Sequence, residues 1–208
     1  MKKFVRVTGI AAALPRINVD TDAIMPKKWC VTASREGLGR GLFAEWRYAA
    51  DETTENPDFV LNHPACRGVR ILVAGANFGC GSSREHAVWA HLDFGIRAIV
   101  APSFASIFYG NCFNNGLLPV RLPEPVVLDI LRQLEARPGA AMSVDLEACT
   151  VTGPDGAVHP FTVEPAARLA LLEGLDEIGA TLKREAAIAA FQAADRARRP
   201  WLWSRSAA

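Results

Sequence analysis

The middle of the chain alternates short, wholly apolar runs with stretches of helical periodicity. Val69–Ala74, Arg97–Ala101 and Leu117–Val120 are short and rich in β-branched residues, which predicts three buried strands. Between them the apolar spacing predicts a helix over Ser83–Phe94 and a second, shorter one that is capped by Ser103 and ended by Gly116. This succession predicts a β-α-β-α-β unit, and therefore an α/β fold around a parallel sheet.

Further elements are predicted on both sides of this unit. The first is a strand over Phe4–Ile10, where apolar and polar residues alternate. A helix follows the unit, with Pro125 in its first turn and an apolar stripe that ends at Leu134. The remaining predicted elements are a strand at Met142–Leu146, a β-hairpin of Ala148–Thr152 and Val158–Val163 around the turn GPDG, and two C-terminal helices at Pro165–Glu173 and Lys183–Arg198.

Three segments lack a clear periodic pattern. Residues 27–47 mix glycines with charges, which predicts a mobile loop, and residues 51–64 are polar and contain two prolines, which predicts a surface excursion. We therefore expect one domain over residues 1–198, with a loop-rich excursion at 27–64 and a tail at 199–208. Trp201 and Trp203 in that tail are candidates for packing on the domain or on a partner.

Composition excludes several classes of protein. The 208 residues include 23 basic and 22 acidic side chains, a net charge of +1, which gives no electrostatic basis for binding nucleic acid or an anionic membrane. No apolar run approaches the ~20 residues of a membrane span, and the N-terminus lacks the pattern of a signal peptide. A cytoplasmic protein is expected. The five cysteines include no CxxC pair, so the spacing offers no site for zinc or an iron–sulfur cluster.

The segment that carries chemistry is Asn77–Ala87, NFGCGSSREHA, where a predicted strand ends and a helix begins. Ligands of open α/β sheets bind at the carboxyl ends of strands, and helix N-termini attract anions. Gly79 and Gly81 permit a tight turn, and Arg84 adds a guanidinium suited to a carboxylate or phosphate. These features together predict a site for a small anion.

Other interpretations of this segment remain open on local pattern. Ser82 and Glu85 fit an S-x-x-E capping box, which would need no catalytic role. Cys80 with His86 fits, more weakly, a thiolate nucleophile. A phosphate-binding loop is a third possibility, although the sequence GxxxxGK[ST] is absent.

Longer motifs favour one family. GANFGCGSSREHA, the following APSFASIFYGNCFNNGLLPV, and NVDTDAI at Asn18–Ile24 resemble the swivelling β/β/α domain of the aconitase superfamily. GLDEIGATL at Gly174–Leu182 resembles the closing motif of isopropylmalate dehydratase small subunits. These motifs occur in the expected order and cover most of the chain. The resemblance implies an α/β swivelling domain and a hydro-lyase activity.

The resemblance also implies roles for individual residues. In this superfamily the first serine of GSSRE removes the proton next to a carboxylate, which assigns the catalytic base to Ser82. Ser83 and Arg84 match the residues that bind the substrate carboxylate, and Arg35, in ASREGLG, matches an arginine that helps to recognise substrate. The DTD motif near the active site corresponds to Asp20, Thr21 and Asp22.

The implied reaction is the interconversion of 2-isopropylmalate and 3-isopropylmalate through 2-isopropylmaleate, in leucine biosynthesis. The resemblance implies a [4Fe–4S] cluster held by a separate large subunit in a heterodimer or higher assembly, with no metal and no cofactor bound by this chain. A relative acting on homoaconitate, citraconate/2-methylmalate or dimethylmaleate is an alternative, with residues 27–47 deciding between substrates. A non-enzymatic binding module of the same fold is another.

Overall fold

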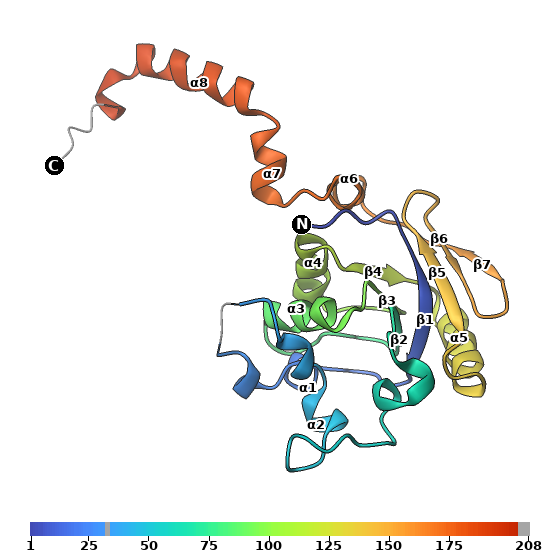
Figure 1. Cartoon of the computed structure of the whole chain (residues 1–208). Helices are drawn as coiled ribbons and strands as arrows, with labels where there is room; N and C mark the ends of the chain where they lie inside the picture. Colours follow the sequence, from blue (N-terminus) through green and yellow to red (C-terminus); the bar gives the residue numbers. More distant parts are fainter. Residues whose placement is uncertain (32–33, 204–208) are drawn as a thin grey trace. The chain divides into compact units, whose positions relative to one another are not determined.

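A computed structural model describes residues 1–31 and 34–203. It divides into two compact units, residues 1–174 and residues 175–208. The helices and strands, labelled in Figure 1, are β1 Arg6–Leu14, α1 Thr21–Ile24, α2 Ala44–Arg47, β2 Ile71–Ala74, α3 Glu85–Phe94, β3 Ala98–Ala101, α4 Ser106–Asn115, β4 Leu118–Arg121, α5 Glu124–Ala136, β5 Ala141–Asp145, β6 Thr150–Thr152, β7 Val158–Pro160, α6 Pro165–Glu173, α7 Glu177–Leu182 and α8 Glu185–Arg198. No helix of this described part is long and apolar enough to cross a membrane.

The first unit is built on one seven-stranded sheet with the order β4-β3-β2-β1-β5-β6-β7. Strands β1 to β4 run parallel, whereas β5, β6 and β7 are antiparallel additions on the other edge of β1. The predicted β-α-β-α-β unit and the predicted hairpin are both confirmed. The carboxyl ends of β1 and β2 lie at the same edge of the sheet, which is where the candidate site forms (Figure 1).

Strand β1 is longer than predicted and carries the sheet from its antiparallel to its parallel half. Arg6–Ile10 pair with β5, and Ala11–Leu14 pair with β2. The second half went unpredicted because three consecutive alanines show no alternation of apolar and polar residues. In the structure Ala12 and Leu14 belong to the core on one face of the sheet, whereas Ala11 and Ala13 belong to the core on the other. Because both faces are covered, the strand needs no polar side.

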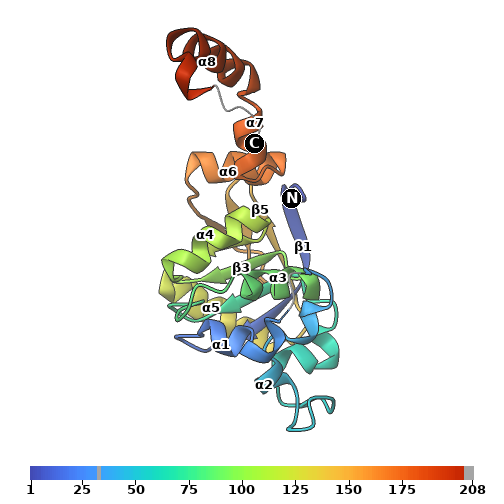
Figure 2. The same cartoon turned by 90° about the vertical axis from the view of Figure 1, so that its left-hand side faces the viewer.

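Helices cover both faces of the parallel half (Figures 1 and 2). The buried apolar residues of α3, with Phe108 and Cys112 of α4, belong to one hydrophobic cluster, and those of α5, with Phe113 of α4, belong to the other. The stripe predicted for α5 is confirmed, since Val127, Ile130, Leu131 and Leu134 are buried. The predicted helix ends at Gly95 and Gly116 are also confirmed, with φ of 109° and 88° in the left-handed region that favours glycine.

The prediction that residues 27–47 form a mobile loop is wrong for the second half of this segment. Short helices at Leu38–Arg40 and Ala44–Arg47 are packed there, and Leu42 and Phe43 are fully buried. Gly39 and Gly41 serve close packing, because a Cβ at Gly39 would lie 2.9 Å from the backbone nitrogen of Phe94 and one at Gly41 would lie 2.8 Å from Cγ of Trp29. Residues 32 and 33 lie outside the described part.

Two predicted helix starts are wrong by two or three residues. Helix α3 begins at Glu85 with Arg84 as its N-cap, so Ser82 does not form the capping box; the Glu85 carboxylate instead accepts a hydrogen bond of 2.7 Å from Asn115 Nδ2. Helix α4 begins at Ser106, and the Ser103 hydroxyl accepts a 2.8 Å bond from the backbone N–H of Asn77. In both cases a long-range polar partner replaces the local cap.

The second unit is a helical segment of α7, α8 and a 3-10 turn at Pro200–Leu202. The helix predicted at Pro165–Glu173, which belongs to the first unit, is confirmed as α6; the one predicted at Lys183–Arg198 begins at Glu185, and α7 was not predicted. After α8, Trp203 Nε1 donates to Asp195, 3.0 Å away. The single domain expected over residues 1–198 stays a prediction.

Candidate active site

The loops that follow β1 and β2 meet at the carboxyl edge of the sheet. The backbone N–H of Gly79 donates to Val19 at 2.7 Å, and that of Thr21 donates to Cys80 at 2.8 Å. Asp20 and Cys80 form an isolated parallel bridge. The sequence motifs DTD and GCGSSRE, about sixty residues apart, are therefore held side by side as an extension of the β1–β2 pairing.

The turn between β2 and α3 depends on two glycines in the left-handed region. Gly79 has φ +77°, and a Cβ there would lie 2.2 Å from Cγ of Phe108. Gly81 has φ +87°, but a Cβ there would meet nothing closer than 3.4 Å. Asn77, also left-handed at φ 57°, donates from Nδ2 to Asn18 at 2.8 Å, which ties the two loops together again.

Ser82 is exposed and is oriented by Thr21. The Thr21 hydroxyl donates to the Ser82 carbonyl oxygen at 2.8 Å, and the two hydroxyl oxygens are 3.4 Å apart. A threonine has one hydroxyl proton. Because that proton is engaged, the Ser82 hydroxyl is the donor in the longer contact. Thr21 itself is 1% exposed, so its orientation is fixed by packing.

Arg84 lies beside Ser82 with only 14% of its side chain exposed. Its Nη1 donates to the Asp22 carboxylate and to the Met25 carbonyl oxygen, the latter at 3.4 Å. Asp22 is 58% exposed, so the guanidinium is held from the protein side while its carboxylate partner faces solvent. Ser83, between Ser82 and Arg84, is exposed. Ser82 and Ser83 lie just before Arg84, the N-cap of α3, and the N-terminal end of a helix favours negative charge.

Arg35 is placed apart from this cluster. Its guanidinium lies over the Trp89 ring, 4.8 Å from the centroid, on the second turn of α3. Trp89 Nε1 donates to Asn115 at 2.9 Å, and Asn115 Nδ2 donates to Glu85. The structure thus brings Asp20, Thr21, Asp22, Ser82, Ser83 and Arg84 together and sets Arg35 on the flank of the same helix.

Two titratable groups near the turn are held neutral. Burial, and secondarily the Asp20 carboxylate, raise the pKa of the Cys80 thiol, which disfavours the thiolate required of a nucleophile. Burial lowers the pKa of His91 to about 4. Its Nδ1 is 2.7 Å from the Ala87 carbonyl oxygen, so the proton sits on Nδ1, and no partner in the described part of the chain bonds Nε2. The His91 ring contacts Phe78 and Phe108 and serves as aromatic packing beneath the turn.

Sequence reasoning missed Thr21 as the residue that orients Ser82. Nothing in the local pattern marks this role, because Thr21 acts across 61 residues. The backbone contacts that place Thr21 could be anticipated only from the pairing of β1 with β2.

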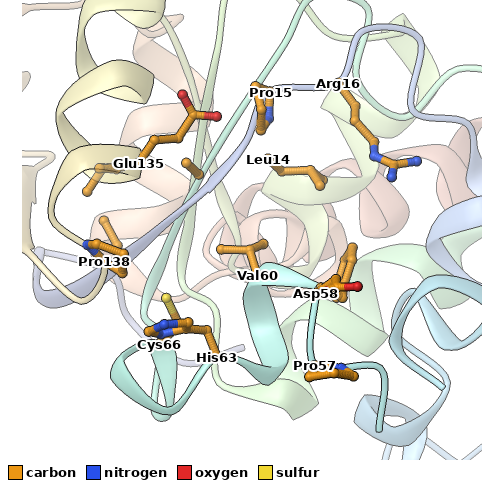
Figure 3. A pocket seen from close by; sticks show the side chains of 14 residues that line it. Leu14, Pro15, Arg16, Pro57, Asp58, Val60, His63, Cys66, Glu135 and Pro138 are labelled. Carbon is orange, nitrogen blue, oxygen red and sulfur yellow. The ribbon is translucent and has the colours of Figure 1, made fainter.

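Two cavities are lined in part by the loop that follows β1. One, of about 340 Å³, lies between β1, α5 and residues 57–66, with Arg16, His63 and Glu135 on its rim (Figure 3). Another, of about 450 Å³, includes Arg16, Asn18 and Asp20. Ser82 lines neither cavity and is itself exposed.

Metal ligands do not converge in the described part of the chain: no three His, Cys, Asp or Glu side chains there are grouped to hold an ion. The five cysteines are free. Cys66 and Cys112 are buried, and burial raises the pKa of both thiols. This donor set does not fit an iron–sulfur cluster, which requires clustered thiolates.

Residues 1–125 match the family described as the aconitase C-terminal domain, residues 129–165 match LeuD_N, and residues 177–202 match the C-terminal domain of the 3-isopropylmalate dehydratase small subunit. The 3-isopropylmalate dehydratase small subunits of Paramagnetospirillum magneticum and Parvibaculum lavamentivorans are 55% and 54% identical to this chain, over 97% of it and 100% of each relative. The chain belongs to the family of 3-isopropylmalate dehydratase small subunits. The family's enzyme is a hydro-lyase, which sets aside the non-enzymatic module and favours isopropylmalate over the alternative diacids.

The fold of these small subunits is also found in a solved structure. The crystal structure of a 3-isopropylmalate dehydratase from Methanocaldococcus jannaschii covers 88% of this chain and 98% of its own length, with a TM-score of 0.65 and 27% identity. The predicted swivelling α/β fold of the aconitase superfamily is confirmed. Membership of a small-subunit family implies a large-subunit partner.

Proposed function

We propose that this chain supplies the proton-transferring half of the interconversion of 2-isopropylmalate and 3-isopropylmalate, with Ser82 as the base. The observation that carries the proposal is the exposed Ser82 hydroxyl, which lies 3.4 Å from the buried Thr21 hydroxyl in the turn just before Arg84 and α3. Ser82 removes the proton from the carbon next to a carboxylate and later returns one. The positive charge of Arg84 and the helix N-terminus stabilise the serine alkoxide while it acts.

Recognition of the dicarboxylate falls to groups around this hydroxyl. Arg84 and Ser83 bind one substrate carboxylate, for which the guanidinium offers a two-point fork. Asp22 holds that guanidinium in place, and Asp20 fixes the loop by accepting a 2.7 Å bond from the Ala23 N–H. Arg35, held on Trp89, is positioned to recognise the substrate from the flank of α3. The roles of Ser83, Arg84 and Arg35 follow the resemblance, whereas those of Asp20 and Asp22 follow their contacts; substrate binding by Asp20, Thr21 and Asp22 stays a prediction.

The Lewis acid that accepts the substrate hydroxyl belongs, in this proposal, to the large subunit as a [4Fe–4S] cluster. The support comes from the cysteines of this chain. They are dispersed rather than grouped around one point, so none of them is assigned as a ligand of the cluster. The active site is then completed between two chains in a heterodimer or higher assembly. A cytoplasmic location is part of the proposal and is supported by the free cysteines, which suit a reducing compartment.

The test is anaerobic co-expression with the large subunit and assay of the purified complex. We expect Ser82→Ala to lower kcat by at least about a hundredfold, the lower range for loss of an acid–base group, while the complex still assembles. Ser143→Ala is the matched control, because that hydroxyl bonds Thr8 on the exposed face of β5 and β1. A loss below threefold in Ser82→Ala, or turnover by the small chain alone, would contradict the assignment.

A further inference from the structure

The segment of residues 175–203, which we call the arm, has almost no core of its own. It contains α7, α8 and the turn at Pro200–Leu202, yet Asp195 is its one buried residue in the part of the chain described. Helices of 6 and 14 residues are marginal in water when they stand alone. The arm therefore needs a surface to fold against.

The arm also presents large apolar side chains that nothing within it covers. Ile178 and Leu182, four residues apart, share one face of α7, and Ile188 and Phe191, three apart, share one face of α8. Ile178 is 71% exposed and Phe191 is 62% exposed. Apolar residues at this spacing form the anchoring stripe of a helix that binds in a groove.

The end of the arm is preorganised. Asp195 is contacted by Arg199 Nε at 2.7 Å, by Arg198 at 3.2 Å and by Trp203 Nε1 at 3.0 Å. Arg196 stacks on the same indole ring, 4.7 Å from its centroid. This folds the last residues back on α8. A prefolded end lowers the entropy lost on binding.

The family matches bear on which surface the arm binds. The match to the aconitase C-terminal domain ends at residue 125, whereas residues 177–202 match the C-terminal domain of the 3-isopropylmalate dehydratase small subunit. A domain within a longer chain stays near its neighbour at a high effective concentration, but a separate subunit must bind it. The arm is thus found in a family in which this domain is a separate subunit and has to bind its neighbour.

From these observations we infer that the arm is a docking segment that binds an apolar groove of the large subunit through Ile178, Leu182, Ile188 and Phe191. The inference rests on the proposed two-chain function. It assigns to the arm a share of the binding energy that is separable from the chemistry at Ser82.

The test uses the full chain with Ile188→Asp and Phe191→Asp together. The matched control is Ala190→Asp with Ala193→Asp, which adds the same charges to α8 about 200° further around the helix; both alanines are exposed. Sedimentation velocity with the purified large subunit under anaerobic conditions gives Kd. We expect the first pair to raise Kd at least roughly tenfold and the control to raise it less than threefold.

The kcat of the complex, measured beside Kd, distinguishes a failure of this inference from a failure of the proposed function. At saturating large subunit the first pair should keep the wild-type kcat, whereas Ser82→Ala should lose kcat with an unchanged Kd. Equal Kd values for the two pairs would overturn the docking inference alone. It would also be overturned if the first pair lowered the melting temperature of the isolated chain, since the arm would then cover its own first unit, or if it dissociated a small-chain dimer.

Discussion

Gly79→Ala offers a direct measure of how tightly the turn before Ser82 is constrained. Two costs add at this position. A left-handed φ of +77° costs a residue with a Cβ about 1–2 kcal/mol. The new Cβ would also lie 2.2 Å from Cγ of Phe108, a ring that is 2% exposed and packed 5.4 Å from Phe78. Overpacking of a filled core costs about 1–3 kcal/mol. We expect the free energy of unfolding to fall by about 2–5 kcal/mol.

Gly81→Ala isolates the cost of placing a residue with a Cβ in the left-handed region. Gly81 has nearly the same conformation, with φ +87°, but its added Cβ would come no closer than 3.4 Å to Asp20. We therefore expect a loss of about 1–2 kcal/mol. Urea denaturation of both variants, followed by circular dichroism at equal slope m, gives the difference between them. Equal losses for Gly79→Ala and Gly81→Ala would refute the packing argument and show that Phe108 moves aside.

Three further predictions concern the groups around the turn. Thr21→Val removes the donor to the Ser82 carbonyl oxygen and should lower kcat of the complex at least tenfold. Thr21→Ser is the control, because it keeps the hydroxyl and should keep most of the activity. Equal kcat values for the two variants would contradict the orienting role. Arg84→Lys should raise KM, measured with isopropylmalate, because a point charge does not replace the two-point fork; an unchanged KM would count against it. The pKa of His91, lowered from 6.5 to about 4, means that the unfolded chain binds a proton that the folded chain does not. The contribution of neutral His91 to the free energy of unfolding is therefore complete above pH 6.5 and is lost as the pH falls toward 4. Between pH 7 and pH 5 it falls by about 2 kcal/mol. Urea titrations at both pH values should show this difference in the wild type and a smaller one in His91→Gln; the same pH dependence in both chains would contradict it.

The sequence was most informative where one pattern determined one element. The three short parallel strands are wholly apolar because both faces of the sheet are covered, and this buried composition is visible in Val69–Ala74 and its neighbours. Glycines at helix ends were equally clear. The pattern failed at residues 38–47, because Gly39 and Gly41 resemble a mobile loop although they permit close contact with α3 and Trp29. A glycine that allows flexibility and one that allows close packing look the same in sequence.

The candidate site was predictable as a set of motifs but not as an arrangement. The position of Ser82 between a strand and a helix followed from local pattern. Its partner Thr21 did not, because the contact spans 61 residues and depends on the pairing of β1 with β2. The same long-range contacts explain the misplaced helix starts. Ser82 and Ser103 are good helix caps in isolation, but each has a polar partner from a distant loop.

The exposure of Ser82 gives the two-chain arrangement a physical purpose under the proposed function. In bulk water the attraction between unit charges 4 Å apart is about 1 kcal/mol, and it rises to about 4 kcal/mol at an effective dielectric constant of 20. Arg84 is already oriented by Asp22 in the isolated chain, so docking need not build the positive site. Docking has only to exclude water from it. The same guanidinium then stabilises a serine alkoxide several times more strongly, and the base becomes effective only when the partner that accepts the hydroxyl is present.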